Sequence, residues 1–284
     1  PQEQTSAFYI NSKWQNHHGN KLHLHSFFNT DSVVASVLDS YKVSYSLNYP
    51  IKAIHTYLTP RLQYAIKRIN YFTPSKADQI KDMKTAFISK NDTHSSKLFW
   101  QAYSQYQDDA FYHLKISPCV HPDNADLPCV RPNYSQLFYE YKPYVKTIAN
   151  QFYLSNNSKQ NSFVDAIENA QEWVQIMPDS DEVQDHFAPP ISVLKSNSAD
   201  SDEKALLLAT LVSQVAPQYK LFMVYPSASV GSVSPVWLTI DSKSGMKGKQ
   251  ITINSNQYTV ISGSDNQLEE MLSINTRMTS ESLY

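Results

Sequence analysis

The chain has 284 residues, of which 41% are hydrophobic and 18% are charged, and its formal net charge is −2. This is the composition of a globular protein with one large core or two modest ones, and it excludes a disordered or fibrous chain. A near-neutral charge with scattered lysines and arginines gives no reason to expect nucleic acid or an anionic membrane as a partner. With only 5 glycines, the chain has no glycine-rich phosphate-binding loop.

The first half of the chain is predicted to be mainly helical after a polar N-terminal arm. Residues 1–30 are polar, with Leu22, Leu24 and Phe27 as apolar points, so we expect a strand or an irregular arm. Apolar residues then recur at helical spacing in four segments, and Pro60 predicts a break or kink in the second of them. The four segments are residues 32–47, 51–72, 77–88 and 97–114. The aromatic residues of the last segment are at helical spacing, which favours core packing over a sugar or peptide site.

The N-terminal arm carries the densest group of histidines, His17, His18, His23 and His25. In a strand, His23 and His25 would point to the same face, as metal ligands do. Because no acidic residue or cysteine lies at ligand spacing in the sequence, we interpret these residues as surface histidines. We therefore expect neither a metal nor a cofactor.

The only two cysteines, Cys119 and Cys129, flank a segment rich in Pro, Asn and Asp that is expected to be a surface loop. A disulfide closing this loop would contribute about 2–3 kcal/mol, and the alternative is two unpaired thiols. A disulfide implies an oxidising compartment, so we expect a periplasmic or extracellular protein. The start at Pro1 fits a processed or trimmed product, and the longest strongly apolar stretch, residues 205–212, is too short to span a bilayer.

The second half of the chain predicts helices followed by strands. The helices are expected at residues 134–152, 162–176 and 199–215, with Ser201 and Asp202 as capping residues of the last one. From residue 220 the hydrophobic period changes to two, which indicates strands. The four strands are expected at residues 221–225, 236–240, 250–254 and 257–262. Helices followed by a run of strands indicate an α+β domain with helices packed on an antiparallel sheet.

Four short phrases of this second half resemble a known family, and the resemblance covers roughly residues 140–265. The most specific is ADSDEKALLLATL at residues 199–211; the others are WVQI at 173–176, PPISVL at 189–194 and PVWL at 235–238. In order and spacing they resemble the transglutaminase-like superfamily of cysteine proteases and transglutaminases. The resemblance implies a papain-like α+β core over residues 134–284, preceded by a mainly helical N-terminal region, residues 1–117, and a disulfide linker, residues 118–133.

The same resemblance implies that the family's catalytic residues are lost. In that family a cysteine at the helix N-terminus is the nucleophile, a histidine on the facing strand is its base, and a carboxylate orients the histidine. Their places are taken here by Ser201, Pro235 and Ser262. No histidine follows His186 and no cysteine follows Cys129, so no shift of the alignment restores the family's Cys-then-His order.

The resemblance therefore implies a pseudoenzyme that acts as a binding or scaffold module for a protein, peptide or cell-wall partner. The expected cleft is lined by Ser201, Asp200, Asp202, Trp237 and Trp173. A second hypothesis is a serine-based hydrolase or amide transferase in which Lys204 assists Ser201. Against it stands a structural interpretation, with Ser201 as a helix cap and Lys204 solvated or paired with Asp200. In a third hypothesis the C-terminal half is a support and the N-terminal half binds the partner.

Overall fold

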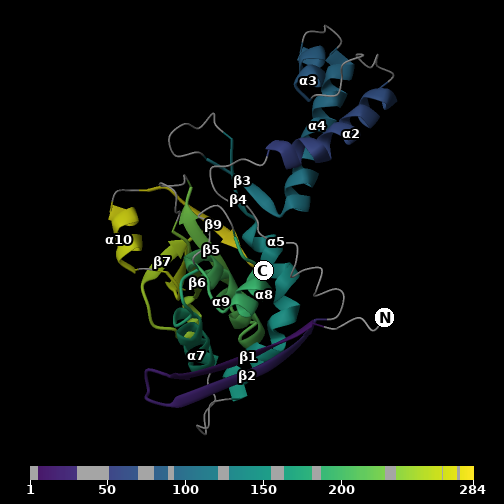
Figure 1. Cartoon of the computed structure of the whole chain (residues 1–284). Coiled ribbons are helices and arrows are strands. Elements are labelled where there is room, and N and C mark those ends of the chain that lie inside the picture. The colour runs from purple at the N-terminus through teal and green to yellow at the C-terminus, as the bar shows by residue number, and fades with distance from the viewer. Residues whose placement is uncertain are drawn as a thin grey trace, which may run out of the picture.

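The computed structural model of this chain describes residues 6–30, 51–69, 80–88, 93–120, 128–154, 163–180, 187–227, 235–263, 265–273 and 276–284. Within these ranges the protein has an α+β body and an arm of helices that projects from it (Figure 1). The helix expected at residues 32–47 lies outside the described residues.

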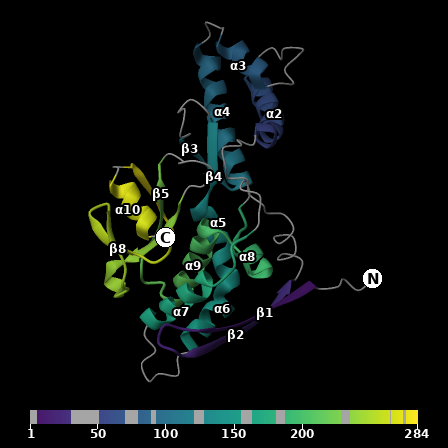
Figure 2. The same cartoon turned by 60° about the vertical axis from the view of Figure 1, so that its left-hand side comes forward.

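The N-terminal arm is a regular hairpin of two strands, β1 (Ser6–Gln15) and β2 (Lys21–Thr30), which pair antiparallel. Side chains alternate along both strands, because successive residues of a strand point to opposite faces. Trp14 and Leu24 are buried on the inner face, where Trp14 packs on Phe152 with ring centroids 6.0 Å apart. The hairpin lies across the lower end of the body (Figure 2). A strand was one of the two structures expected here, and an irregular arm is excluded.

Three helices form the projecting arm: α2 (Ile51–Arg68), α3 (Ile80–Ile88) and α4 (Thr93–Leu114). A break or kink was predicted at Pro60; the break is excluded, since α2 runs through this residue without interruption. Proline removes one helical hydrogen bond. The apolar stripe of α2 is buried on both sides of Pro60, from Ile54 to Ile66, and this packing offsets the missing bond.

The two cysteines form a disulfide, as predicted, and they lie in paired strands; the loop predicted between them, residues 121–127, lies outside the described residues. Strand β3 (Ile116–Val120) pairs antiparallel with β4 (Pro128–Pro132), and Cys119 stands directly opposite Cys129 with their Cα atoms 5.0 Å apart. This ribbon follows α4 directly and leads into the body, so the disulfide cross-links the two strands that lie between arm and body (Figure 1).

The body is built around one buried helix, α9 (Ser201–Val215), in which 12 of the 15 residues are buried. Such a helix must be covered on all sides. Helices cover it on one side and the sheet on the other (Figure 1). The covering helical elements are α5 (Tyr134–Tyr141), η1 (Lys142–Val145), α6 (Lys146–Leu154), α7 (Phe163–Gln175) and α8 (Pro190–Ser196).

The sheet has five strands in the order β7-β8-β6-β5-β9, and all neighbours are antiparallel. The strands are β5 (Leu221–Pro226), β6 (Trp237–Asp241), β7 (Gln250–Ile253), β8 (Asn256–Val260) and β9 (Met278–Ser282). The first four confirm the strand predictions, whereas β9, the short helix η2 (Ser242–Ser244) and helix α10 (Asp265–Ser273) were not predicted.

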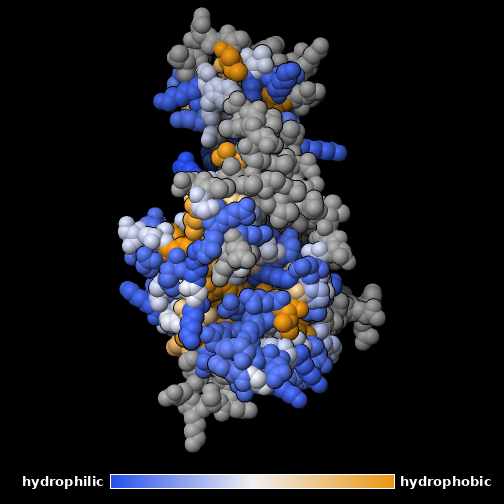
Figure 3. Space-filling model, turned by 90° about the vertical axis from the view of Figure 1, so that its left-hand side faces the viewer, coloured by the Kyte–Doolittle hydropathy of each residue, from blue (hydrophilic) through white to orange (hydrophobic). Residues whose placement is uncertain are grey.

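The two faces of the sheet belong to two hydrophobic clusters. Met223 and Leu238 pack in the main core with α9, while Phe222, Trp237 and Leu268 of α10 form a smaller cluster on the opposite face. A pocket of about 470 Å³ opens beside this smaller cluster, between α10 and strands β7 and β9. The side of the molecule that carries α10 is mostly hydrophilic, with small separate hydrophobic patches (Figure 3).

Candidate functional site

The N-terminus of α9 is closed by a capping box. The side chain of Asp200 accepts the Glu203 N–H at 3.2 Å, and the Glu203 carboxylate accepts the Asp200 N–H at 3.0 Å. The prediction that Ser201 caps the helix is therefore wrong; Ser201 is its exposed first residue. Lys204 forms an ion pair with Asp179 at 2.7 Å, and the hydrogen bond from Lys204, together with its charge, lowers the pKa of that carboxyl.

Two carboxylates of the first turn of α9 are buried. Glu203, which is 1% exposed, also accepts the N–H of Ala188 in a short hydrogen bond and so ties the preceding loop to the helix. Asp202, which is 3% exposed, accepts the Tyr134 hydroxyl at 2.9 Å. Burial raises the pKa of Asp202 well above its usual range, and the neighbouring Asp200 and Glu203 carboxylates raise it further. Through these contacts, the acidic residues at the start of α9 hold this helix to α5 and to the loop before α8.

A second polar cluster joins α5 to the sheet. Glu281 of β9 accepts the Ser135 N–H at 2.5 Å and the Tyr225 hydroxyl at 2.9 Å. The Arg131 guanidinium lies 4.1 Å from the centre of the Tyr225 ring. Burial raises the pKa of Glu281, and burial together with the Glu281 charge raises the pKa of Tyr225. Since each polar group has a partner within the cluster, its role is to hold β5 and β9 against α5.

The residues expected to line a cleft with Ser201 are not gathered there. Trp173 is fully buried in the main core, and Trp237 is fully buried in the smaller cluster on the other face of the sheet. The Ser262 hydroxyl accepts the Leu238 N–H at 3.0 Å, so it completes the hydrogen bonding of β6. Pro235 lies just before β6. The cleft prediction for the two tryptophans is wrong because their large apolar rings fill the two cores.

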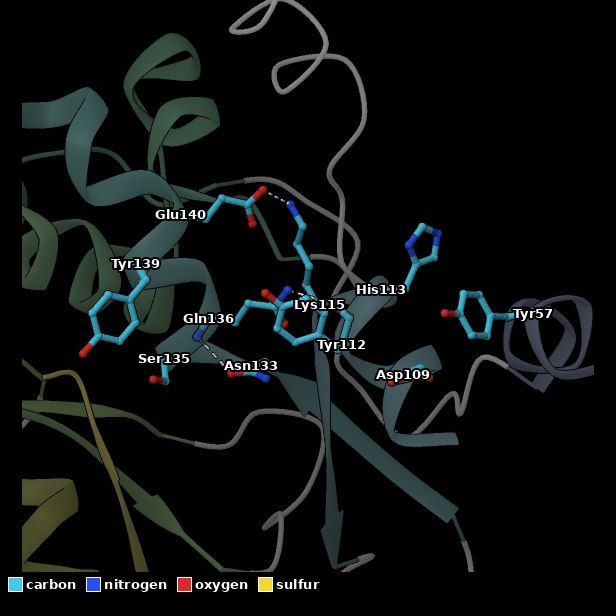
Figure 4. Close-up of a pocket in the computed structure, with 10 residues that line it drawn as sticks. All are labelled: Tyr57, Asp109, Tyr112, His113, Lys115, Asn133, Ser135, Gln136, Tyr139 and Glu140. Atoms are coloured by element: carbon cyan, nitrogen blue, oxygen red, sulfur yellow. Dashed lines mark hydrogen bonds and ion pairs between the residues drawn. The ribbon is translucent and has the colours of Figure 1, made fainter. Parts of the chain in front are cut away.

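An open pocket of about 910 Å³ lies instead where the arm meets the body (Figure 4). Helices α2, α4 and α5 contribute its walls, together with Lys115 and Asn133, which flank the β3–β4 ribbon. The lining residues are Tyr57, Asp109, Tyr112, His113, Lys115, Asn133, Ser135, Gln136, Tyr139 and Glu140. Tyr112 and Tyr139 are 67% and 53% exposed, an unusual exposure for such large rings.

Fixed polar contacts shape the walls of this pocket. Lys115, at the end of α4, forms an ion pair with Glu140 at 2.5 Å. The Gln136 side-chain amide donates to the Tyr112 carbonyl at 2.9 Å, and this leaves the buried Gln136 Oε1 without a partner among the described residues. An acceptor buried without a donor is costly, so Gln136 Oε1 is a locally unsatisfied group in the wall of the pocket.

The sequence carried one overlooked signal for the pocket. Phe99, Tyr103 and Tyr106 follow the inner face of α4, and Ala110 continues that face. Tyr112 is out of phase with this stripe and therefore points outward, although it was interpreted as part of the core. The partners from α2 and α5 were not predictable, because they are distant in the chain.

Comparison with known proteins adds no relative: no family model, no curated protein and no solved structure matches this chain. The resemblance to the transglutaminase-like superfamily therefore stays a prediction that rests on the four phrases quoted above. The function must be argued from the pocket and from the surroundings of α9.

Proposed function

We propose that this chain is a non-catalytic binding module that holds an extended segment of a protein partner in the pocket between arm and body. The observation that carries the proposal is the lining of that pocket. Three tyrosines and the side chains of Asn133, Ser135 and Gln136 face one open space. Tyrosine offers a large, rigid contact area at low entropic cost, and small polar side chains adapt their hydrogen bonds, as in protein-binding paratopes.

The contacts of Tyr57 support the same proposal. Tyr57 lies between the Arg61 guanidinium, 3.5 Å from its ring centre, and the His113 ring, 5.3 Å away. A side chain that is already ordered loses little entropy when a partner binds.

We further propose that the body is a degenerate transglutaminase-like core. A buried helix packed on an antiparallel sheet is consistent with such a core, and the capping box of Asp200 and Glu203 lies at the start of α9, where the resemblance expects the nucleophile of the family. A periplasmic or extracellular location is supported by the Cys119–Cys129 disulfide. Within the described residues, every helix is too short or too polar to cross a membrane.

The serine-based hydrolase is the weaker alternative, because the lysine that would activate Ser201 is paired with Asp179. A fluorophosphonate probe is therefore expected to leave Ser201 unmodified in the folded protein at neutral pH, as read by peptide mass spectrometry. A known serine hydrolase in the same tube serves as the positive control. A stoichiometric adduct on Ser201 would establish a reactive serine and overturn the non-catalytic proposal.

For the binding proposal, a display library of linear peptides selected on the native protein is expected to yield peptides that bind the pocket. Tyr112→Ala should weaken the affinity for these peptides at least about tenfold in fluorescence anisotropy titrations, because central aromatic contacts dominate such interfaces. Tyr64→Ala is the matched control, since Tyr64 is a similarly exposed tyrosine (60%) of the arm that does not line the pocket. A peptide-binding pocket is contradicted if the selected peptides bind Tyr112→Ala as tightly as they bind the native protein. It is also contradicted if cell-wall glycan fragments displace every selected peptide, since the peptides would then only mimic a glycan ligand.

A further inference from the structure

The turn of the N-terminal hairpin is fixed against helix α7. The Asn16 side-chain amide donates to Asn169 Oδ1 of α7 at 3.0 Å, and both residues are buried. Within the turn, the Gly19 N–H donates to the Asn16 carbonyl at 2.8 Å, and Gly19 adopts a φ of 79° that favours glycine. The two residues between them, His17 and His18, are therefore held over the surface of α7.

His17 meets two carboxylates there. Glu168 and Glu172 are four residues apart, so they lie on one face of α7. His17 Nε2 is 3.5 Å from Glu168 Oε2. On the other side, Glu172 Oε1 accepts the backbone N–H of His17 at 3.0 Å and also contacts its ring Nδ1 in a short hydrogen bond. The His18 ring lies beside the His17 ring, with centroids 3.7 Å apart.

We propose that this cluster binds a divalent ion of the zinc class, with His17, His18 and Glu168 as ligands and Glu172 as a positioning residue. In a tetrahedral site with bonds of about 2.0–2.1 Å, neighbouring ligand atoms are about 3.3 Å apart. The 3.5 Å between His17 Nε2 and Glu168 Oε2 fits this spacing. One ligand atom from each of the three residues lies within 4.8 Å of the others, and His18 is exposed and can turn to close the remaining gap.

The contact with Glu172 is what separates this cluster from an accidental group of charges. A carboxylate that accepts the Nδ1–H of a histidine fixes its tautomer and directs the Nε2 lone pair outward, as in carboxylate–histidine–zinc sites. Here that lone pair faces the side where Glu168 lies. Two imidazoles and a carboxylate suit zinc and similar transition metals rather than magnesium or calcium, which prefer oxygen ligands.

An ion in this position ties the hairpin to α7 and leaves a fourth coordination position for water or another ligand. The sequence did not predict the site because its acidic residues are about 150 positions from the histidines. The expectation that the histidines lack an acidic partner is corrected by α7. This inference does not depend on the proposed peptide pocket, whose lining shares no residue with the cluster.

The experiment is a calorimetric titration of Zn²⁺ into tag-free protein that has been stripped with a chelator. We expect one equivalent to bind, and Co²⁺ in its place should give the visible absorption of a tetrahedral site. His18→Ala and Glu168→Gln should weaken binding at least about tenfold, and Glu172→Gln by about 10- to 100-fold, as outer partners of metal ligands do. The matched control is His23→Ala with His25→Ala, a pair of exposed histidines on the outer face of the same hairpin.

The proposal is overturned if native protein binds no stoichiometric Zn²⁺, in which case His17 only forms ion pairs with α7. It is also overturned if His18→Ala and Glu168→Gln bind as tightly as native protein, or if only the His23 and His25 control loses the ion. The melting temperature of each metal-free variant shows whether it is folded, and the Co²⁺ spectrum of native protein needs no variant at all.

Discussion

Replacing Glu203 by alanine is expected to lower the free energy of unfolding by about 3 kcal/mol, measured by urea denaturation at constant pH. The substitution removes the acceptor for two backbone N–H groups, those of Ala188 and Asp200. A buried donor left without a partner costs about 1–3 kcal/mol, and loss of the capping box adds about 1 kcal/mol. Relief of the repulsion between Glu203 and Asp202 offsets part of this cost.

Glu270→Ala is the matched control for this prediction, since Glu270 is exposed on α10 and its substitution should change stability by no more than about 0.5 kcal/mol. If Glu203→Ala lowers the free energy of unfolding by less than about 1 kcal/mol, the capping box contributes little to the stability of the body. The carboxylates at the start of α9 would then be open to another role.

Asp202→Asn is expected to make the protein more stable at neutral pH and to flatten the pH dependence of its unfolding. The folded protein binds the Asp202 proton more tightly than the unfolded chain, because burial and the Asp200 and Glu203 carboxylates raise its pKa. The stability due to this proton is fully present below the unfolded pKa of 3.8 and is lost as the pH rises through the folded pKa. Each unit of raised pKa corresponds to about 1.4 kcal/mol.

Asparagine does not titrate, and its side-chain oxygen can still accept the Tyr134 hydroxyl. Between about pH 4 and pH 8, the free energy of unfolding measured with urea should therefore fall less with rising pH for Asp202→Asn than for native protein. The raised pKa of Glu281 has the same sign, so part of the decline persists in the variant. Asp109→Asn, at an exposed position of α4, should leave the curve unchanged. An Asp202→Asn curve as steep as the native one would mean that Asp202 is charged in the folded protein.

Much of the fold was predictable because periodicity reports burial directly. Helix α9 is buried on nearly all sides, and β5 and β6 are short apolar runs buried on both faces of the sheet, so these elements were expected with nearly correct bounds. Pro60 misled the prediction of α2, since the cost of one missing hydrogen bond is local whereas the packing that offsets it is tertiary. The capping residue was misplaced by one position, because Asp200 and Ser201 are both good caps and only the backbone decides between them.

The sites were much less predictable than the fold. The resemblance placed Trp237 and Trp173 in one cleft, but a sheet separates the two hydrophobic clusters to which they belong. The pocket combines Tyr57, Tyr112 and Tyr139 from three helices, and the histidine cluster joins the hairpin to α7. Contacts between segments that are far apart in the chain produce no regular spacing of residues in the sequence, so they can be recognised only in the folded protein.

We propose that this chain binds its partner through the pocket between arm and body and not at the start of α9. One titration with a selected pocket peptide tests it, using Tyr112→Ala and Ser201→Trp side by side. We predict that Tyr112→Ala loses at least about tenfold in affinity, whereas Ser201→Trp, at an exposed residue outside the pocket, binds like native protein. The account is contradicted if Ser201→Trp abolishes binding while Tyr112→Ala leaves it unchanged.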